Sequence, residues 1–227
     1  MIPERQLWLV EGIPGSGKST TAGLLRDACA SRGRAARWWL EEARDHPVTS
    51  TALKASAAGP DFPARCLEAF RAFLTREDGV LILDGAAMQS TIRFMFANRC
   101  EVEEIADYFD QWSVLVEPTA ARLVYLDIDD PKSHYLDFLI PVRGVEWTDK
   151  LVRYVESTPI AQANAWRGTE GLVCFWSGYQ DLCRAMLSRL RGPVLAFPAE
   201  PSRNSGLDPA IREFIGLGTP VWPTVGP

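Results

Sequence analysis

One stretch near the start of the chain combines the residue types that bind a polyphosphate. Residues 12–19, GIPGSGKS, fit the spacing G-x-x-x-x-G-K-S/T. Its glycines let the backbone curl until several N–H groups converge on an anion. Residues 6–11 are rich in apolar side chains and predict a strand, whereas residues from 18 onward predict a helix with its positive end at the anion. We expect a phosphate-binding loop between a strand and a helix.

The chemistry of such a loop gives each residue a role. Lys18 is expected to reach the β and γ phosphates of ATP, and the Ser19 hydroxyl to ligate the Mg²⁺ that bridges them. Thr20 is expected near the α phosphate. The expected cofactors are therefore ATP and Mg²⁺. The predicted nucleotide-binding residues are Gly12, Ile13, Pro14, Gly15, Ser16, Gly17, Lys18, Ser19 and Thr20.

Two later strands are predicted to end in acids. Residues 79–84 form a continuous apolar run that closes on Asp84, and strand 35–40 runs into Glu41 and Glu42. Ligands in an open α/β sheet lie beyond the carboxyl ends of its strands. We expect Asp84 to hold Mg²⁺, or to hold or deprotonate the acceptor, and Glu41 to act as a base or to bind the acceptor. The alternatives are a structural Asp before a turn and a solvated Glu at a strand end, and the sequence leaves open which acid is the base.

Three further polar residues are candidates for the acceptor side. Gln89 and Arg93 stand four residues apart within 86–98, so they share one face if this segment is helical. Arg143 lies in the segment 133–171, which fits no strand and is interpreted as a helical lid. A lid arginine would neutralise charge on the transferring phosphoryl group. A surface position is the alternative for Arg143.

The remaining elements follow from apolar periodicity and from turn residues. Residues 43–63 are rich in Pro, Gly, Ser and Ala and predict a mobile segment on the substrate side, and residues 199–207 are expected beside the adenine. Two more strands are predicted at 121–128 and 193–198. Helices are predicted at 18–32, 63–76, 101–116, 179–190 and 208–217.

Composition bounds the class of protein. The chain has 227 residues, of which 47% are hydrophobic and 23% charged, as expected for one globular domain over 1–227. The net charge of −5 without a basic run argues against a nucleic-acid partner. No apolar run reaches the length of a membrane span, so no membrane partner is predicted and the expected location is cytoplasmic. The five scattered cysteines indicate buried thiols, and a homodimer is left open.

The order of these motifs resembles that of the small P-loop kinases. The stretches IPGSGKST and LVYLDIDDP are similar to those of the thymidylate kinase-like nucleotide kinases, which have kin among small-molecule and antibiotic phosphotransferases. The resemblance implies a three-layer α/β fold with a five-stranded, mostly parallel sheet of order 2-3-1-4-5, flanked by helices and carrying a lid segment. The chain departs from the family where thymidylate kinases have an Asp-Arg-Tyr type motif, because it has Asp84-Gly85-Ala86.

This departure removes the arginine that would hold a nucleotide acceptor. The leading hypothesis is therefore an ATP-dependent kinase that moves the γ phosphate onto a hydroxyl of a small metabolite or natural product. The alternatives are a nucleoside or nucleotide kinase, and a nucleotide-binding switch or ATPase that acts through a protein partner. Several aromatic residues would suit a larger acceptor, although aromatics more often form the core: Trp38, Trp39, Phe94, Phe96, Trp112 and Trp147.

Overall fold

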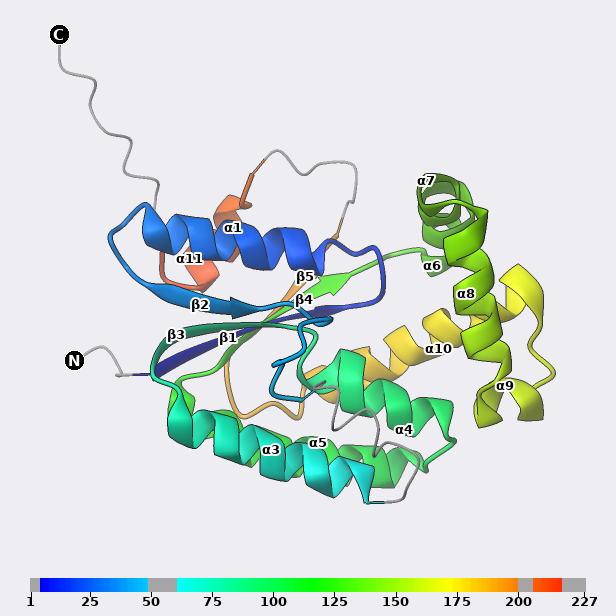
Figure 1. Ribbon diagram of the computed structural model, residues 1–227, viewed down its shortest axis with the longest axis horizontal. Helices are drawn as coiled ribbons and strands as arrows, with labels where there is room; N and C mark the ends of the chain where they lie inside the picture. The colour runs from blue at the N-terminus through cyan, green and yellow to red at the C-terminus, as the bar shows by residue number, and fades with distance from the viewer. Residues whose placement is uncertain (1–4, 49–60, 200–205, 218–227) are drawn as a thin grey trace, which may run out of the picture.

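A five-stranded parallel sheet forms the centre of the molecule (Figure 1). The computed structural model describes residues 5–48, 61–199 and 206–217. The strand order is β2-β3-β1-β4-β5, and every neighbouring pair is parallel, so the predicted order 2-3-1-4-5 is confirmed. The strands are β1 Arg5–Gly12, β2 Ala36–Trp39, β3 Gly79–Asp84, β4 Arg122–Asp127 and β5 Val194–Pro198.

Helices cover both faces of this sheet and complete three layers. Figure 1 shows α1 (Lys18–Ala30) and α11 (Pro209–Phe214) on one face, with α3 (Phe62–Arg76), α5 (Val102–Val116) and α10 (Gly168–Leu187) on the other. Side chains of β1 alternate between the two layers: Trp8 and Val10 belong to the core under α1, and Leu7 and Leu9 to the core over α3 and α5. Because β1 is buried on both faces, its carboxyl end is held firmly in place.

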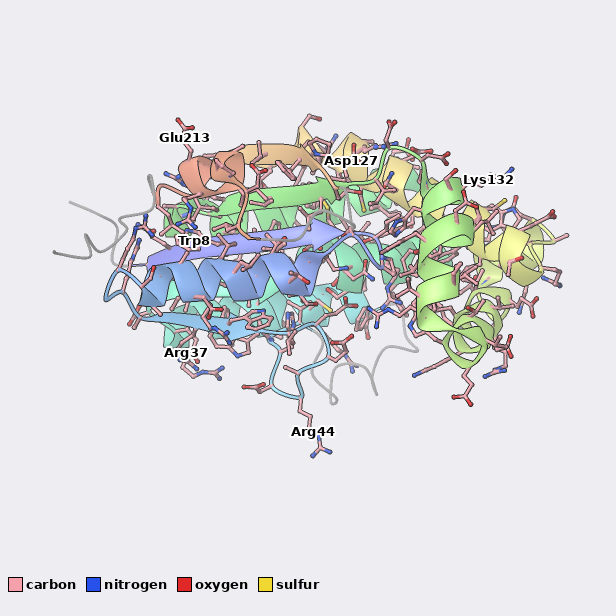
Figure 2. All side chains as sticks on the ribbon, turned by 90° about the horizontal axis from the view of Figure 1, so that it is seen from above. Trp8, Arg37, Arg44, Asp127, Lys132 and Glu213 are labelled. Atoms are coloured by element: carbon pink, nitrogen blue, oxygen red, sulfur yellow. The ribbon has the colours of Figure 1, made fainter. Side chains whose placement is uncertain are left out.

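Shorter helices gather at the carboxyl ends of the strands. Figure 2 shows the helical segment that begins at Pro131, next to the labelled Lys132, lying across the direction of α1 at this end of the sheet. A second group follows β3 and includes a π-helical turn, η1. These helices are η1 Ala87–Ile92, α4 Arg93–Ala97, α6 Pro131–Ser133, η3 His134–Leu139, α7 Ile140–Arg143, α8 Val145–Glu156 and α9 Pro159–Ala163. The short helix η2, Glu117–Thr119, precedes β4 at the amino end of the sheet.

The predicted start of the long helix at residue 179 is wrong, because α10 begins at Gly168. The part of the helix that was not predicted contains Gly168, Gly171 and Gly178, and glycine lowers helix propensity. Gly171 is explained by packing: a Cβ there would stand 2.7 Å from the backbone carbon of Trp166. Glycine at this position therefore lets the helix pack closely against Trp166, in the chain that precedes it.

Smaller differences concern the ends of elements. The helix expected at 101–116 is present, but Val102 is 55% exposed because it stands in the first turn, ahead of the buried stripe of Ile105, Ala106, Phe109 and Val116. The segment 86–98 is helical from residue 87, which puts Gln89 and Arg93 on successive turns. Of the predicted mobile segment 43–63, residues 49–60 lie outside the described part of the chain.

Within the described ranges, no helix combines the length and the apolar character that crossing a membrane would require.

Two valines of α5 offer a matched test of the core. Val116→Ala removes two methyl groups from a side chain that is 1% exposed, so we expect the free energy of unfolding to fall by about 2 kcal/mol. Val102→Ala makes the same chemical change in the exposed first turn and should alter it by less than about 0.5 kcal/mol. Urea unfolding of both variants measures the difference. Equal losses would contradict the assignment of the buried face of α5.

Candidate nucleotide and acceptor site

The loop after β1 has the backbone geometry of an anion cradle. Gly15 and Gly17 have φ angles of 82° and 94°, a region that favours glycine. Gly17 is followed directly by α1, so the N-terminus of that helix faces the loop. Gly12 is required by space, since a Cβ there would lie 2.7 Å from the carbonyl oxygen of Leu126 on β4. The residues present therefore fit a bound polyphosphate.

The first turn of η3 packs directly on this loop. The Nε2 atom of His134 lies 3.1 Å from the carbonyl oxygen of Pro14, so a neutral ring protonated on Nε2 donates a hydrogen bond to the loop. Burial lowers the pKa of His134, which favours this neutral form. A Cβ on Gly15 would stand 2.7 Å from Leu139 and 2.8 Å from His134. The phosphate-binding loop and the predicted lid segment thus share one packed contact.

Charged groups from three elements meet at the start of α1. The Ser19 hydroxyl donates to Oδ2 of Asp84 at 2.5 Å, which joins the loop to the end of β3. Lys18 is buried, and its Nζ lies 4.0 Å from Oε2 of Glu41 and 3.4 Å from the carbonyl oxygen of Ile13. Lys18, Ser19, Glu41 and Asp84 were each predicted for the site, and the fold brings them together.

Ser19 and Asp84 also fit the oxygen ligands that Mg²⁺ prefers. Oδ1 of Asp84 is buried and has no hydrogen-bond partner among the described residues. Over the same residues, no group of three or more His, Cys, Asp or Glu side chains is close enough to hold a metal ion by itself. A divalent cation at this point would therefore depend on the phosphates of a nucleotide for further ligands.

Burial shapes the acid–base properties of both carboxylates. It raises the pKa of Glu41, while the charges of Lys18 and Arg93 oppose the rise. It also raises the pKa of Asp84, against the charge of Lys18 and the Ser19 hydrogen bond. A carboxylate whose pKa lies above its ordinary value is better suited to accept a proton near neutral pH.

Gln89 and Arg93 follow β3 on η1 and α4. Gly85, between Asp84 and this helix, has a φ of 71°, and a Cβ there would lie 3.1 Å from Cβ of Gln89 and 3.2 Å from Oε2 of Glu41. Glu41 and Gln89 therefore flank the same glycine. The Nε of Arg93 donates to the carbonyl oxygen of Gln89 at 2.7 Å, and its guanidinium lies 5.3 Å from the ring centre of Tyr154 on α8. The positive charge of Arg93 acts to lower the pKa of Glu41.

Arg143 lies across a cavity from the phosphate-binding loop. The cavity has a volume of about 260 Å³ and is bounded by the start of α1 and by the end of η3 and α7. The guanidinium of Arg143 lies 5.9 Å from the ring centre of Trp147. The residues that line the cavity are Gly15, Gly17, Lys18, Ser19, Thr20, Phe138, Leu139, Val142 and Arg143.

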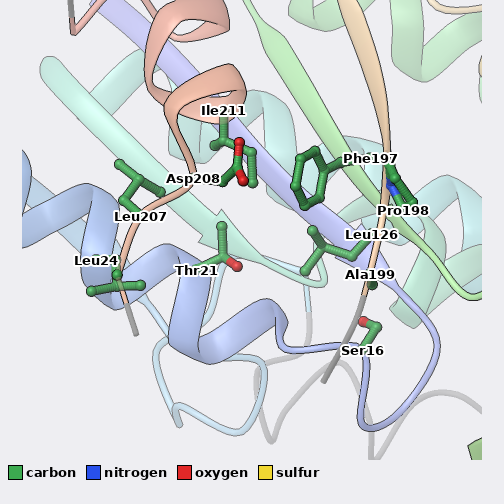
Figure 3. A pocket seen from close by; sticks show the side chains of 11 residues that line it. Ser16, Thr21, Leu24, Leu126, Phe197, Pro198, Ala199, Leu207, Asp208 and Ile211 are labelled. Atoms are coloured by element: carbon green, nitrogen blue, oxygen red, sulfur yellow. The ribbon is translucent and has the colours of Figure 1, made fainter. Parts of the chain in front are cut away.

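A second cavity, of about 180 Å³, lies between the loop and α11 (Figure 3). Leu24, Leu126, Phe197 and Ile211 give it apolar walls, and Ser16 lies at its loop end. Its wall includes Ala199, Gly206 and Leu207, at the two ends of the segment expected beside the adenine, whereas residues 200–205 lie outside the described part of the chain. A cavity beside the loop with apolar walls and with Thr21 and Asp208 as polar lining residues fits the flat face and the polar edge of a nucleobase.

The sequence reasoning missed two residues of this region. Glu11 is fully buried at the end of β1 and accepts hydrogen bonds from the backbone N–H groups of Ala87, Met88 and Gln89. Its signal was an acid inside an apolar strand directly before the loop. His134 offered no signal beyond its type, because its contact with Pro14 spans 120 positions.

Most of the aromatic residues considered for the acceptor belong to the core. Trp112 packs with Phe70 and Phe109, and Phe96 packs against Phe175 and Tyr179. Trp39 is buried against Phe73, and Trp38 lies under the guanidinium of Arg26. Trp147 is the member of the set that lies beside a lining residue of the loop cavity.

Comparison with known proteins extends only to the fold. No protein-family model matches the sequence, and no curated protein matches it in sequence. Shikimate kinase from Bacteroides thetaiotaomicron is similar in structure, with 14% identity, a TM-score of 0.48 and coverage of 93% of this chain and 97% of that chain.

Two other kinases are similar at a lower level. Deoxyadenosine kinase from M. mycoides with bound dATP has 14% identity and a TM-score of 0.41, over 86% of this chain and 91% of that one. Thymidylate kinase from Candida albicans has 15% identity and a TM-score of 0.41, over 88% and 87%. At these levels of similarity, any statement about activity depends on the residues of this chain.

A glycine-rich loop between β1 and α1 of a parallel sheet of order 2-3-1-4-5 defines a P-loop nucleotide-binding fold. The predicted order of strand, phosphate-binding loop and helix is present in the structure as β1, residues 13–17 and α1.

The contact between the loop and η3 predicts the effect of Gly15→Ala. The added methyl group would press on Leu139 and His134 at a φ that disfavours alanine, so the loop must shift and MgADP affinity should fall by about tenfold or more. Gly33→Ala is the matched control, because Gly33 has a φ of 66° but no atom within 4 Å of its Cβ position. Calorimetric titration with MgADP should give wild-type affinity for this control. Unchanged affinity in Gly15→Ala would show that the loop tolerates the contact.

Glu11 predicts a pH dependence of stability. Burial raises the pKa of Glu11 from 4.5 to about 7, although its three N–H partners and Lys18 oppose the rise. Because the folded protein holds this proton more tightly, the contribution of Glu11 to stability is greatest below pH 4.5 and is lost as the pH rises to about 7. Relative to Glu11→Gln, the wild type should lose about 3 kcal/mol of unfolding free energy over this window.

Urea unfolding at a series of pH values measures this difference. Glu104→Gln, which changes a Glu on the exposed first turn of α5, is the control and should leave the pH slope nearly unchanged. Parallel curves for the wild type and Glu11→Gln would contradict the raised pKa of Glu11.

Proposed function

We propose that this protein is a phosphotransferase that moves the γ phosphate of ATP onto a hydroxyl group of a small metabolite or natural product. The observation that carries the proposal is the meeting of Lys18, Glu41 and the Ser19–Asp84 pair at the end of the phosphate-binding loop. A nucleotide-binding switch needs the loop and a metal ligand. A second carboxylate beside the same lysine, that of the partly buried Glu41, supports transfer to an acceptor.

The hydrogen bond between Ser19 and Asp84 indicates different roles for Asp84 and Glu41. Ser19 and Asp84 are proposed as the metal ligands, and Glu41 as the base. Both groups stand where they would hold Mg²⁺, which when bound neutralises the phosphate oxygens. Glu41 is then the base: it takes the proton of the acceptor hydroxyl while the oxygen of that hydroxyl forms a bond to the γ phosphorus. The bond from that phosphorus to the β–γ bridging oxygen breaks, and ADP leaves with the electron pair. The raised pKa of Glu41 suits this role.

Other residues in the proposal orient the reactants. Residues 12–20 hold the phosphates of ATP, and the cavity lined by Phe197 and Leu126 takes the base. Arg143, across the loop cavity, stabilises the charge on the transferring group. Gln89 and Arg93 bind the acceptor from the β3 side.

The decisive experiment is a product screen with the purified protein. ATP and Mg²⁺ are supplied with hydroxylated metabolites, nucleosides, nucleotides and antibiotics, and mass spectrometry detects the gain of one phosphoryl group. A product establishes the kinase and its substrate class, and a nucleoside product would select the nucleoside kinase alternative. MgATP hydrolysis at one slow rate with every compound and no product would favour the switch.

Variants then test the assigned roles. Lys18→Ala should lower kcat/KM by about 10³-fold, and Asp84→Asn or Glu41→Gln by about 10²-fold, because each removes a charge placed at the reacting phosphoryl group. Lys150→Ala, which changes an exposed lysine on α8, is the control and should match the wild type. MgADP affinity should survive Glu41→Gln within about threefold. Near wild-type turnover in Lys18→Ala would refute the site.

A further inference from the structure

Glu11 is a buried acid for which the proposed reaction has no use. It stands at the end of β1, one residue before the loop, with no exposed surface. Burying a carboxylate is costly unless hydrogen bonds compensate it. Its position behind the loop also keeps it from touching a substrate. The role of Glu11 must therefore be inferred from the hydrogen bonds that its carboxylate accepts.

Glu11 is hydrogen-bonded to the N-terminus of η1, the helix that follows β3. Oε1 of Glu11 accepts from the N–H of Ala87 at 2.7 Å and of Met88 at 3.2 Å, and Oε2 accepts from Gln89 at 3.2 Å. The first N–H groups of a helix have no partner inside it, and the helix end attracts negative charge. The N-cap residue here, Ala86, makes no side-chain cap bond. Glu11 supplies the cap from 76 positions away.

The capped helix carries the acceptor-side candidates. Gln89 is one of the three donors, and Arg93 is attached to it by the bond from its Nε to the Gln89 carbonyl oxygen. The same region is tied to β1 a second time, since the N–H of Gly85 donates to the carbonyl oxygen of Val10 at 3.0 Å. Contacts with the carboxyl end of β1 therefore fix the positions of Gln89 and Arg93 relative to the phosphate-binding loop.

We propose that Glu11 is a positioning residue that fixes the start of the helix 87–97 against the phosphate-binding loop and thereby places Gln89 and Arg93 for the acceptor. The structural part of the proposal stands on the three hydrogen bonds. The part that concerns the acceptor rests on the proposed function. The ammonium group of Lys18 adds a favourable interaction with the ionised form of Glu11.

Hydrogen exchange of the Glu11→Gln variant tests the structural part without nucleotide or acceptor. The side-chain amide that this substitution introduces can keep its oxygen toward two donors but must turn its NH₂ group toward the third. We expect the Gln89 amide to exchange about tenfold faster or more, and those of Ala87 and Met88 to change by less than about threefold. Glu104→Gln is the matched control at the start of α5: the single N–H partner there, that of Glu101, can still bond the amide oxygen, so exchange near residue 101 should change by less than about threefold.

Two results would overturn the proposal. Unchanged exchange at all three amides would mean that Glu11 does not hold the helix start. An equal rise over β1, β3 and the helix would mean that Glu11 acts only on global stability. If the variant does not fold, the wild type still provides a test, because titration of Glu11 should shift the three amide protons with one common midpoint, and the absence of such a shift would refute the contact.

Kinetics with the acceptor found in the product screen test the functional part. Glu11→Gln should raise the KM for that acceptor by about tenfold and the KM for ATP by less than about threefold. In a Gln89→Ala background, Glu11→Gln should raise the KM for the acceptor by a smaller factor, because Glu11 acts on the acceptor by positioning Gln89. Equal effects on both KM values, or full additivity with Gln89→Ala, would refute positioning. Failure of the screen itself would refute the proposed function and leave the exchange result intact.

Discussion

The balance of buried charge around Lys18 is the constraint on which the site depends. Three carboxylates, Glu11, Glu41 and Asp84, feel its positive charge, and burial raises the pKa of each. Without the ammonium group, these acids would repel one another and lose a large part of the compensation for their burial. The same group faces the phosphate-binding loop. Bound phosphates and the protein's own acids therefore compete for one cation.

This balance is a consequence of the parallel sheet. The strands β1, β2 and β3 lie side by side and run in one direction, so their carboxyl ends meet at one edge. Each strand places one acid there: Glu11 on β1, Glu41 after β2 and Asp84 on β3. Ser19 and Lys18 enter from α1 between them. Residues more than 70 positions apart become neighbours through strand order alone.

Much of this arrangement could be predicted from local sequence signals. The loop motif, the apolar run that ends in Asp84 and the acids after the second strand can each be recognised within a short stretch of chain, and together they predicted the cluster of Lys18, Ser19, Glu41 and Asp84. The strand order was predicted from the resemblance to the small P-loop kinases. The start of α10 was missed because glycine lowers helix propensity while its packing against Trp166 becomes visible only in three dimensions.

The contacts of Glu11 and His134 could not be predicted for a different reason. Glu11 bonds to backbone N–H groups, which every residue except proline carries, so its partners leave no trace in the sequence. His134 likewise contacts a backbone carbonyl oxygen. Sequence patterns consist of side-chain types and spacings, and they do not reveal contacts in which one partner is the main chain.

The packing of η3 on the phosphate-binding loop, through the contact of His134 with Pro14, has a thermodynamic consequence for nucleotide binding. A loop that changes shape around phosphates must either strengthen or weaken its packing against η3. By linkage, the free energy that a docked η3 adds to nucleotide binding equals the free energy that a bound nucleotide adds to the docking of η3. The two processes are reciprocal, so any ligand or partner that holds residues 134–139 in place acts as an effector of the nucleotide site even if it touches neither phosphate nor base.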